Sequence, residues 1–400
     1  MAKFKQIPQN FLFRQLIKFW GNMVHNYNDD CHDDDFFDVV RNCFDHDKAV
    51  ELIETAYTAA ELDEMAHSKF RYNRLDLSDS LSVVFNALWN HAGSRGKCRH
   101  VLDAIHDFML ADSDESKKGV DVVEKRFSDL TRVMKLDGLE SEILMLAYVK
   151  DQTCFNWPCR IEDREKPLYY AMALDRSYDE VAQALSPQGK LLKFNLLDAD
   201  YDFSRRTLGG FMDGTSDETI ERRFYTKVDL KDALPWAFYG DLAKKDGEVL
   251  KRMVAASGGK CNILLYGAPG TGKTSFARSL AKELGRTVFE VKQGDDDGRN
   301  MKSEARMVGI QVCNDQEDPA ESLVVVDEAD ELLRGSSCGF SLFGFRFGGG
   351  KSTEKGVMNT LLDEMRIPTV WISNAPARAM DESVRRRFDY SICFERLNGA

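Results

Sequence analysis

The stretch Gly267-Ala-Pro-Gly-Thr-Gly-Lys-Thr274 decides the fold of this chain of 400 residues. It follows the apolar run Asn262–Tyr266 and precedes a helical pattern from Ser275 to Leu284. A strand, a glycine-rich turn and a helix in this order form a cradle for phosphate groups. Glycine lets the backbone curl so that successive N–H groups point at phosphate oxygens. The sequence therefore predicts a nucleotide site at this turn.

The side chains of the cradle add a cation and a metal ligand. Lys273 places a positive charge near the β- and γ-phosphates, and the Thr274 hydroxyl can ligate Mg²⁺. The predicted nucleotide-binding positions are Gly267, Ala268, Pro269, Gly270, Thr271, Gly272, Lys273, Thr274 and Ser275.

Two carboxylates and an amide follow two later apolar runs. Asp327 and Glu328 end the run that begins at Leu323, and Asn374 follows Thr369–Ser373. The carboxyl ends of parallel strands meet at one edge of a sheet, where the cradle also lies. There Asp327 can hold Mg²⁺, Glu328 can take a proton from an attacking water, and Asn374 can orient that water. Taken alone, each of these residues also fits an ordinary strand end or turn.

The segment Arg385-Arg-Arg-Phe-Asp389 is a second source of positive charge. The guanidinium fork suits the charge that develops on a transferring phosphoryl group. Three adjacent arginines cannot all face one phosphate, so one or two would project onto a neighbouring subunit's nucleotide. The alternative is a solvated basic helix end.

Strand and helix patterns alternate from about residue 231 onward. This alternation predicts an α/β fold, a parallel sheet of five strands with flanking helices. The expected strands are 261–266, 287–291, 323–327, 369–373 and 390–394, and the expected helices are 273–284, 300–314, 355–366 and 378–386.

The part before residue 231 has a different pattern of apolar residues. Helical spacing in Ala49–Phe70, Leu81–His91 and Val120–Met134 predicts a mainly helical domain over residues 1–135. Residues 136–230 read as a mixed α/β region, in which Tyr178–Leu185 and Leu191–Leu197 form a helix-turn-strand like that of a small winged-helix unit. Residues 231–400 form the third predicted region.

The composition of the chain limits the kinds of partner it can bind and indicates the cellular compartment. The net charge of −12 excludes bulk attraction to nucleic acid, which would need a local basic patch. Nine cysteines without framework spacing indicate a reduced, cytoplasmic protein. No apolar run reaches the length of a membrane span.

His25, Cys31, His32, Cys43 and His46 carry side chains that can bind zinc. Their spacing matches no common zinc finger, so scattered structural residues are the favoured interpretation.

Four further segments have two interpretations each. Phe11–Val24 could lie on a membrane, but packing within the helical domain is favoured. Trp236 or Tyr239 could stack on a base or fill the core. The run Asp295–Asp297 reads as a solvated loop rather than a cation site, and the glycine- and phenylalanine-rich loop 335–350 reads as a flexible insertion or as a finger that grips a substrate.

Together, Gly267–Thr274, Val324–Glu328, Asn374 and Arg386–Phe388 resemble the AAA branch of the AAA+ ATPases, over about 231–395. Met358–Asp363 and the segment Met380–Phe388 resemble that branch as well. The resemblance implies ATP and Mg²⁺ as cofactors.

The resemblance also implies a role for each matching residue. Lys273 and Thr274 become ligands of a P-loop, Asp327 and Glu328 a Walker B pair, and Asn374 the sensor 1 residue. Arg386 and Arg387 become arginine fingers that act in trans, in a homo-oligomeric ring that is hexameric in the complete protein.

The chain is most similar to a poorly characterised group of bacterial AAA proteins, in which a helix like Leu139–Val149 and a winged-helix-like region precede the ATPase. It departs from the wider family in two places. Members that thread proteins carry an aromatic–apolar–glycine triplet where this chain has Gln293–Gly298, and the helical lid with its sensor-2 arginine would follow Ala400. We therefore expect the C-terminal lid to be absent from this chain.

These features predict an ATPase whose hydrolysis of ATP drives conformational remodelling of an unidentified protein partner. The alternative is a nucleotide-gated switch that regulates nucleic acid or a partner enzyme through residues 175–230. The acidity of the chain favours the first.

Overall fold

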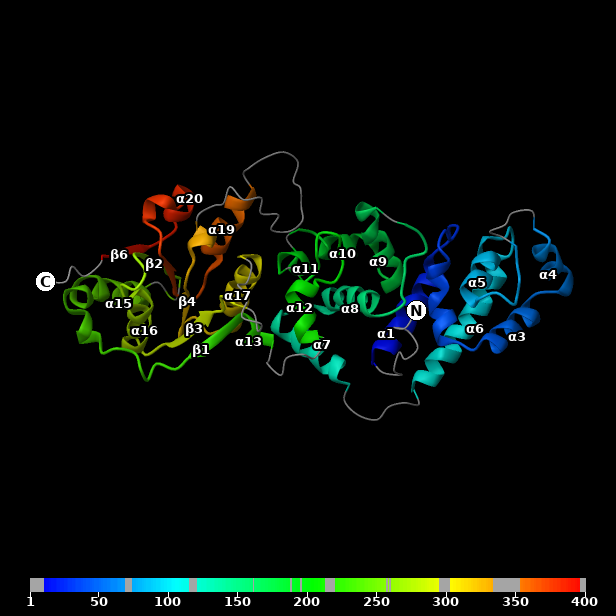
Figure 1. Ribbon diagram of the computed structural model, residues 1–400, viewed down its shortest axis with the longest axis horizontal. Coiled ribbons are helices and arrows are strands. Elements are labelled where there is room, and N and C mark those ends of the chain that lie inside the picture. The colour runs from blue at the N-terminus through cyan, green and yellow to red at the C-terminus, as the bar shows by residue number, and fades with distance from the viewer. Residues whose placement is uncertain are drawn as a thin grey trace. The chain divides into compact units, whose positions relative to one another are not determined.

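The computed structural model divides into two compact units, Met1–Asp213 and Gly214–Ala400 (Figure 1). It describes residues 11–68, 74–114, 121–160, 162–187, 189–194, 196–212, 220–256, 258, 260–294, 303–333 and 353–395. The boundary predicted at residue 135 lies inside the first unit, and the boundary predicted at residue 230 lies inside the second. The division into three regions stays a prediction.

The first unit is built from helices around an aromatic core. Its elements are α1 (Phe11–Asn26), η1 (Asp34–Phe37), α2 (Asp38–Cys43), α3 (His46–Ala56), α4 (Ala59–Ala66), α5 (Leu81–Asn90), α6 (Arg95–Asp114), α7 (Val122–Val133), α8 (Gly138–Gln152), η3 (Asp163–Glu165), α9 (Lys166–Leu174), α10 (Tyr178–Ala184), α11 (Lys190–Lys193) and α12 (Arg205–Met212). The helix expected at Phe11–Val24 forms as α1 and packs against α6, α8 and α9. Its Leu16, Ile17 and Trp20 are fully buried, so its apolar face lies in the core of this unit.

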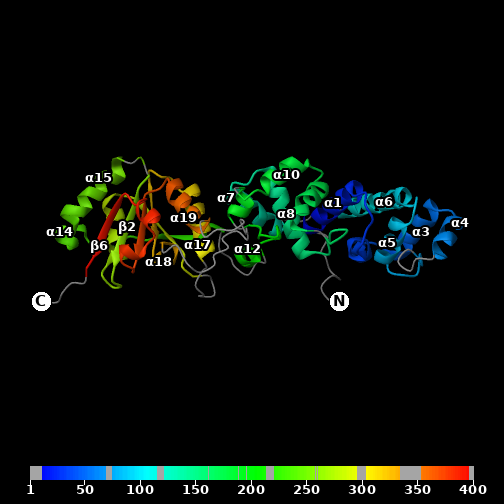
Figure 2. The same ribbon diagram turned by 90° about the horizontal axis from the view of Figure 1, so that it is seen from above.

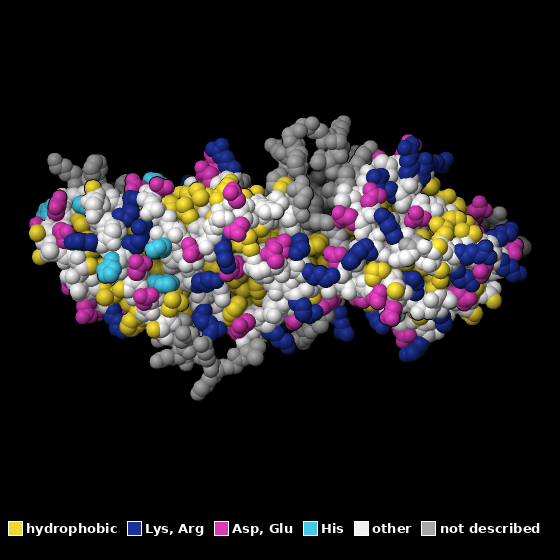
Figure 3. Space-filling view, turned by 180° about the vertical axis from the view of Figure 1, so that it is seen from behind, with side chains coloured by type: hydrophobic (Ala, Val, Ile, Leu, Met, Phe, Trp, Pro, Cys, Tyr) yellow, Lys and Arg dark blue, Asp and Glu magenta, His cyan; other side chains and the backbone are white. Residues whose placement is uncertain are grey.

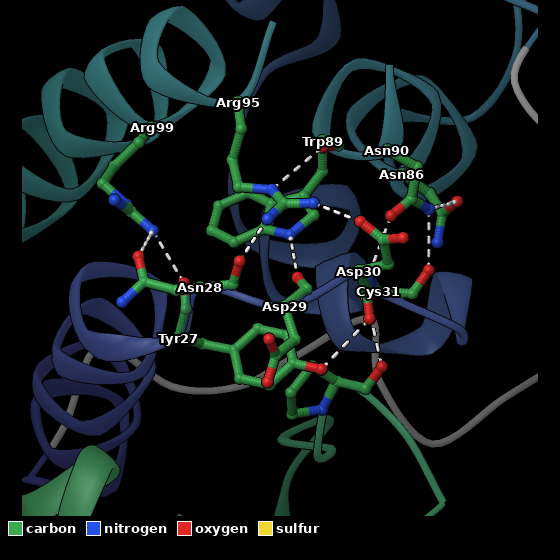
Figure 4. Close-up of polar contacts among 11 residues, drawn as sticks. Tyr27, Asn28, Asp29, Asp30, Cys31, Asn86, Trp89, Asn90, Arg95 and Arg99 are labelled. Carbon is green, nitrogen blue, oxygen red and sulfur yellow. Dashed lines mark hydrogen bonds and ion pairs between the residues drawn. The ribbon is translucent and has the colours of Figure 1, made fainter. Parts of the chain in front are cut away.

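The loop after α1 is held by side chains of α5 and α6 (Figure 4). Asn90 accepts a hydrogen bond from the Cys31 N–H at 2.8 Å and donates one to the Cys31 carbonyl at 2.7 Å. Arg99 donates to the Tyr27 carbonyl at 2.6 Å, and Trp89 donates through its indole to the Asp29 carbonyl at 3.0 Å. The backbone polar groups of this loop are therefore satisfied by side chains rather than by regular structure.

The thiol of Cys31 takes part in the same packing. It donates to the carbonyls of Asp33 and Pro158, each at 3.3 Å, and burial raises its pKa to about 12. Within the ranges that the structure describes, no three His, Cys, Asp or Glu side chains gather as a metal site would require.

The strand expected at Leu191–Leu197 is wrong. Lys190–Lys193 form the short helix α11, in which Leu191 and Leu192 are buried, and only an isolated bridge joins Leu197 to Phe203. Both adjacent leucines are buried by one helical turn, whereas successive side chains of a strand would point to opposite faces.

The second unit is a six-stranded sheet with the strand order β1-β3-β4-β5-β2-β6. Its strands are β1 (Tyr225–Val228), β2 (Asn262–Gly267), β3 (Thr287–Val291), β4 (Ser322–Val326), β5 (Thr369–Ser373) and β6 (Tyr390–Phe394). The five strands β2 to β6 are parallel, as predicted. The sixth, β1, was not predicted and pairs antiparallel with β3 at one edge.

Helices cover both faces of this sheet (Figures 1 and 2). They are α13 (Ile220–Phe224), η4 (Trp236–Tyr239), α14 (Gly240–Leu242), η5 (Ala243–Gly247), α15 (Glu248–Ala256), α16 (Lys273–Glu283), α17 (Ser303–Gln316), α18 (Asp330–Leu333), α19 (Thr353–Glu364), η6 (Ala377–Ala379) and α20 (Glu382–Arg385). On one face, Phe276 and Leu280 of α16 pack with Ile263, Val325 and Val370 of the sheet.

The opposite face is covered by α17 and α19. Asn262, which is buried at the start of β2, donates to the Leu362 carbonyl of α19 at 2.9 Å and accepts from the Trp371 indole at 3.1 Å. Because both faces are covered, β4 and β5 are buried along their whole length, which explains their continuous apolar sequence.

Charges of both signs are mixed on the surface drawn in Figure 3, where lysine and arginine side chains lie among aspartates and glutamates. None of the helices in the described ranges has the length and hydropathy needed to cross a bilayer.

Candidate nucleotide site

The strand order brings the predicted site residues to one edge of the sheet. In that order β5 lies between β4 and β2, so the three strands carrying the cradle, the acidic pair and Asn374 are neighbours. The cradle follows β2, the acidic pair follows β4, and Asn374 follows β5.

Glycine is required at three points of the cradle. Gly267 has a φ of 137°, and a Cβ atom there would lie 2.2 Å from the carbonyl oxygen of Phe394. Gly270 and Gly272 have φ values of 77° and 88°, which side chains rarely adopt. The turn therefore delivers the chain to the first residue of α16, Lys273, with the amides of a helix N-terminus exposed to a ligand.

The Lys273 ammonium lies over the loop that precedes it. Its Nζ donates to the carbonyl oxygens of Gly267 at 2.9 Å and Ala268 at 2.8 Å, and to Asn374 Oδ1 at 3.0 Å. Burial lowers the pKa of this lysine, and the nearby carboxylates of Asp327 and Asp330 oppose that shift. The predicted phosphate ligand and the predicted water-orienting amide are thus in direct contact.

Thr274 and Asp327 are also in contact. The Thr274 hydroxyl donates to Asp327 Oδ2 at 2.7 Å. A hydroxyl and a carboxylate are hard oxygen donors, which Mg²⁺ prefers. The side chains present therefore fit the Mg²⁺ ion that the sequence implies, and Thr274 and Asp327 would be its ligands.

Glu328 is oriented differently from its neighbour. Its side chain is exposed, and in the described ranges its carboxylate makes no hydrogen bond. Its backbone N–H donates to Asp327 Oδ1 at 2.7 Å, and its φ is 48°. A free carboxylate at the edge of the site can accept a proton from a water molecule.

Asp330 is a site residue that the sequence reasoning missed. Its Oδ1 accepts from the Ser373 hydroxyl at 2.8 Å, the Asn374 N–H at 3.0 Å and the Ala375 N–H at 2.8 Å. This carboxylate ties α18 to the end of β5 and so fixes the turn that presents Asn374. The only sequence signal for this role was the position of Asp330, an acidic residue three positions after Asp327.

The two predicted arginine fingers are held by acidic side chains of their own unit. Arg386 pairs with Glu382, and its side chain is 73% exposed. Arg387 donates through Nε to both carboxylate oxygens of Asp363 at 3.0 Å and through Nη1 to the Ser383 carbonyl at 2.8 Å. In the described residues neither arginine bonds to the cradle of its own chain.

Trp236 and Tyr239 pack on the helix that follows the cradle. Their ring centroids lie 5.4 Å and 5.1 Å from that of Phe276, and the Tyr239 hydroxyl lies 3.3 Å from Ser279 Oγ. These contacts give both aromatics a core role. Asp295–Asp297 and the loop 335–350 lie outside the described residues.

Comparison with known proteins places this site in a family. Residues 263–396 match the family described as "ATPase family associated with various cellular activities (AAA)". A 26S proteasome regulatory subunit homolog of Methanothermobacter marburgensis is 30% identical over 141 residues, which are 34% of this chain and 35% of that protein. The ATP-dependent zinc metalloprotease FtsH of Pelobacter propionicus is 31% identical over 156 residues, which are 36% of this chain and 24% of that protein.

The chain thus spans about a third or less of the length of these relatives. Among solved structures, a similarity is found to the FIGL-1 AAA domain in complex with ADP. The matched region covers 44% of this chain and 59% of that chain, with 20% sequence identity and a TM-score of 0.29. The matched residues hold the cradle, the acidic pair, Asn374 and both arginines. Residues 263–396 therefore form a domain of the AAA ATPase family.

Proposed function

We propose that this chain binds Mg·ATP at residues 267–275 and hydrolyses the bond to the γ-phosphate. The observation that carries the proposal is the pair of contacts Thr274–Asp327 and Lys273–Asn374. These contacts join the phosphate cradle to the end of β4, which carries Asp327 and Glu328, and to the end of β5, which carries Asn374.

Each side chain has a defined task in this reaction. The backbone amides of the cradle and Lys273 would bind the phosphates. Thr274 and Asp327 would hold the metal, which would supply Lewis acidity toward the phosphoryl oxygens. Glu328 accepts the proton of the attacking water, and Asn374 orients that water without competing for its proton. Arg386 and Arg387 serve the nucleotide of a neighbouring copy.

We further propose that turnover drives conformational remodelling of a protein partner by a homo-oligomer in the cytoplasm. The exposure of Arg386 supports action across a subunit boundary, because a side chain turned to solvent is available to a neighbour. The cysteines within the described ranges are free thiols, which supports a reducing compartment. The mixed charges of Figure 3 support a protein partner rather than a nucleic acid.

The test uses calorimetry with Mg·ATP and a phosphate-release assay on the purified chain. Lys273→Ala is expected to abolish binding, and Glu328→Gln to keep binding while turnover falls to a small residual rate. Lys282→Ala is the matched control, because Lys282 lies on the same helix and, among the described residues, its ammonium bonds only to the carbonyls of Lys231 and Ala233. Absence of binding heat for the wild-type chain would contradict the proposal.

The role of the partner is tested in the same assay. Stimulation of phosphate release by a protein fraction, together with a larger mass in light scattering when ATP is present, would support remodelling by an oligomer. Stimulation by DNA or RNA alone would instead favour the regulatory switch.

A further inference from the structure

Arg306 is a buried arginine next to the acidic pair. It lies in the first turn of α17 and is 7% exposed. Its Nη1 donates to the Glu328 carbonyl at 2.8 Å, and its Nη2 donates to the Asp327 carbonyl. One guanidinium group therefore binds the two successive carbonyls that flank the Cα atom of Glu328.

This arrangement fixes the backbone of one residue. The Asp327 carbonyl belongs to the peptide unit before the Glu328 Cα atom, and the Glu328 carbonyl belongs to the unit after it. Rotation about φ or ψ of Glu328 would move one carbonyl relative to the other. Because the guanidinium is a rigid planar fork, it can bind both only while the two carbonyl oxygens keep a matching separation, which restricts φ and ψ of Glu328 together.

The backbone that is held in this way is unfavourable without support. Glu328 has a φ of 48°, in the left-handed region, where a residue with a Cβ atom is strained. Such conformations persist only where the surroundings impose them, and they concentrate at functional sites. Arg306 supplies the support from outside the strand.

The helix that carries Arg306 is itself anchored. A Cβ atom on Gly309 would lie 3.0 Å from the Phe224 carbonyl oxygen, so α17 and the end of α13 pack closely. The Tyr225 hydroxyl donates to Glu317 Oε1 at 2.8 Å at the other end of the helix. A guanidinium mounted on this helix has little freedom to shift.

The charge of Arg306 is adapted to its surroundings. Burial lowers its pKa, and the carboxylates of Glu328 and Asp327 oppose that shift. The Nε atom has no hydrogen-bond partner among the described residues. Burying a charged guanidinium whose Nε atom lacks a partner costs free energy. The two hydrogen bonds to the carbonyls of Asp327 and Glu328 offset part of that cost.

We propose that Arg306 is a positioning residue for ATP hydrolysis, which sets the backbone of Glu328 so that its carboxylate faces the attacking water. The inference rests on the proposed function of this site. Arg306 touches no nucleotide in this scheme, and its effect on the reaction passes through Glu328.

The variants Arg306→Gln and Arg306→Lys test this role. We expect Arg306→Gln to bind Mg·ATP within about 3-fold of wild type, because the cradle is untouched. We expect its kcat to fall about 10- to 100-fold at a similar KM, since small misplacements of a catalytic group have effects of this size. Arg306→Lys keeps the charge but offers one nitrogen, so its kcat should also be at least about 5-fold below wild type. It carries the test if Arg306→Gln does not fold.

Arg286→Gln is the matched control. Arg286 also binds two carbonyls with one guanidinium, those of Pro319 at 2.7 Å and Ser322 at 2.9 Å, but at the opposite end of β4. Burial lowers the pKa of this arginine as well. Its loss should lower the melting temperature while kcat stays within about 2-fold of wild type.

A combined variant separates positioning from a merely structural role. If Arg306 acts through Glu328, Arg306→Gln added to Glu328→Gln should lower turnover no further than Glu328→Gln alone. Additive losses, or a wild-type kcat in Arg306→Gln or Arg306→Lys, would overturn the inference. A wild-type chain that binds Mg·ATP but releases no phosphate would overturn the proposed hydrolysis, and this inference with it.

Discussion

The Thr274 hydroxyl lies 2.7 Å from the Asp327 carboxylate and donates a hydrogen bond to it. This bond joins the first turn of α16 to the end of β4, two segments that are 53 residues apart in the chain. It brings together the two oxygen donors that the metal would need, so the pair is the natural place to test metal dependence.

Replacement of Thr274 should separate nucleotide binding from metal binding. Thr274→Val keeps the shape and removes the hydroxyl ligand, so the affinity for ATP with Mg²⁺ should fall about 10-fold or more, toward the value measured in EDTA. Thr274→Ser keeps the hydroxyl and should stay close to wild type. The measurement is calorimetry with and without Mg²⁺, and equal magnesium dependence in the two variants would count against the assignment.

Asp330→Ala should weaken the site through Asn374. The change removes the acceptor for Ser373 and for two backbone N–H groups, so we expect a loss of about 2 kcal/mol in the free energy of unfolding. Turnover should fall at nearly unchanged affinity, because the turn that presents Asn374 loses its anchor. Urea unfolding and phosphate release measure the two effects.

Asp229→Ala is the control for that change, because among the described residues the Asp229 carboxylate bonds only to Lys231, whose side chain is exposed. It should leave both quantities nearly unchanged. Normal turnover in Asp330→Ala would show that Asn374 does not need this carboxylate.

The arginines can be tested by mixing variants. A chain with Arg386→Ala and Arg387→Ala should bind ATP normally, while its turnover should fall about 10-fold or more in an assembled state. Addition of Lys273→Ala chains, which keep both arginines but no working cradle, should restore part of the turnover. Full activity of the double variant by itself would assign the arginines to the structural pairs with Asp363 and Glu382.

Glu142 gives the first unit a dependence on pH. It accepts hydrogen bonds from Lys18 at 3.1 Å and from Arg176 at 2.9 Å. Burial alone would raise the pKa of Glu142, but the bonds from Arg176 and Lys18 lower it below the ordinary value. A lowered pKa means that the stabilisation is present above the ordinary glutamate value of about 4.3 and is lost as the pH falls through the lower folded value.

Glu142→Gln should therefore destabilise α1 and α8 at neutral pH by at most about 1 kcal/mol, after allowance for solvent screening. The difference from wild type should shrink as the pH falls below about 4. Hydrogen exchange of the amides in these helices measures it. A difference that grows in acid would contradict the sign of the shift.

The parallel sheet was predictable because its strands are buried on both faces. Residues 323–326 of β4 and residues 370–372 of β5 are continuous apolar runs that are fully buried, and β3 and β5 have the predicted bounds. By contrast, β1 is a short edge strand in which Thr226 and Lys227 are exposed, so its sequence gives no apolar pattern to recognise.

The helical spacing noted over Ala49–Phe70 was predicted without the helix boundary that this segment contains. Ala49–Phe70 contains two helices, α3 and α4, because Thr58 and Glu61 form a capping box that starts a new helix. The signal Thr-x-x-Glu was present, and the continuing apolar periodicity concealed it.

The site residues divide in a similar way. Lys273, Thr274, Asp327 and Asn374 were predictable because each is tied to a strand end or to the cradle by its place in the sequence. Asp330 and Arg306 act on backbone groups that lie 45 and 22 residues away, and only the fold brings those groups into reach. Every residue other than proline has the same backbone N–H and carbonyl groups. A side chain that binds them therefore places no requirement on the side chains of the segment that it contacts.

The antiparallel edge strand has a mechanical consequence. The chain of the second unit enters the sheet at Tyr225, and the ladder to β3 begins at that residue with the pair Tyr225–Val291. Tension applied along β1 would load the hydrogen bonds of this ladder together, whereas tension applied across the strand would break them one after another. Such tension would reach β3 and, through it, β4, the strand that ends at Asp327 and the proposed proton acceptor Glu328.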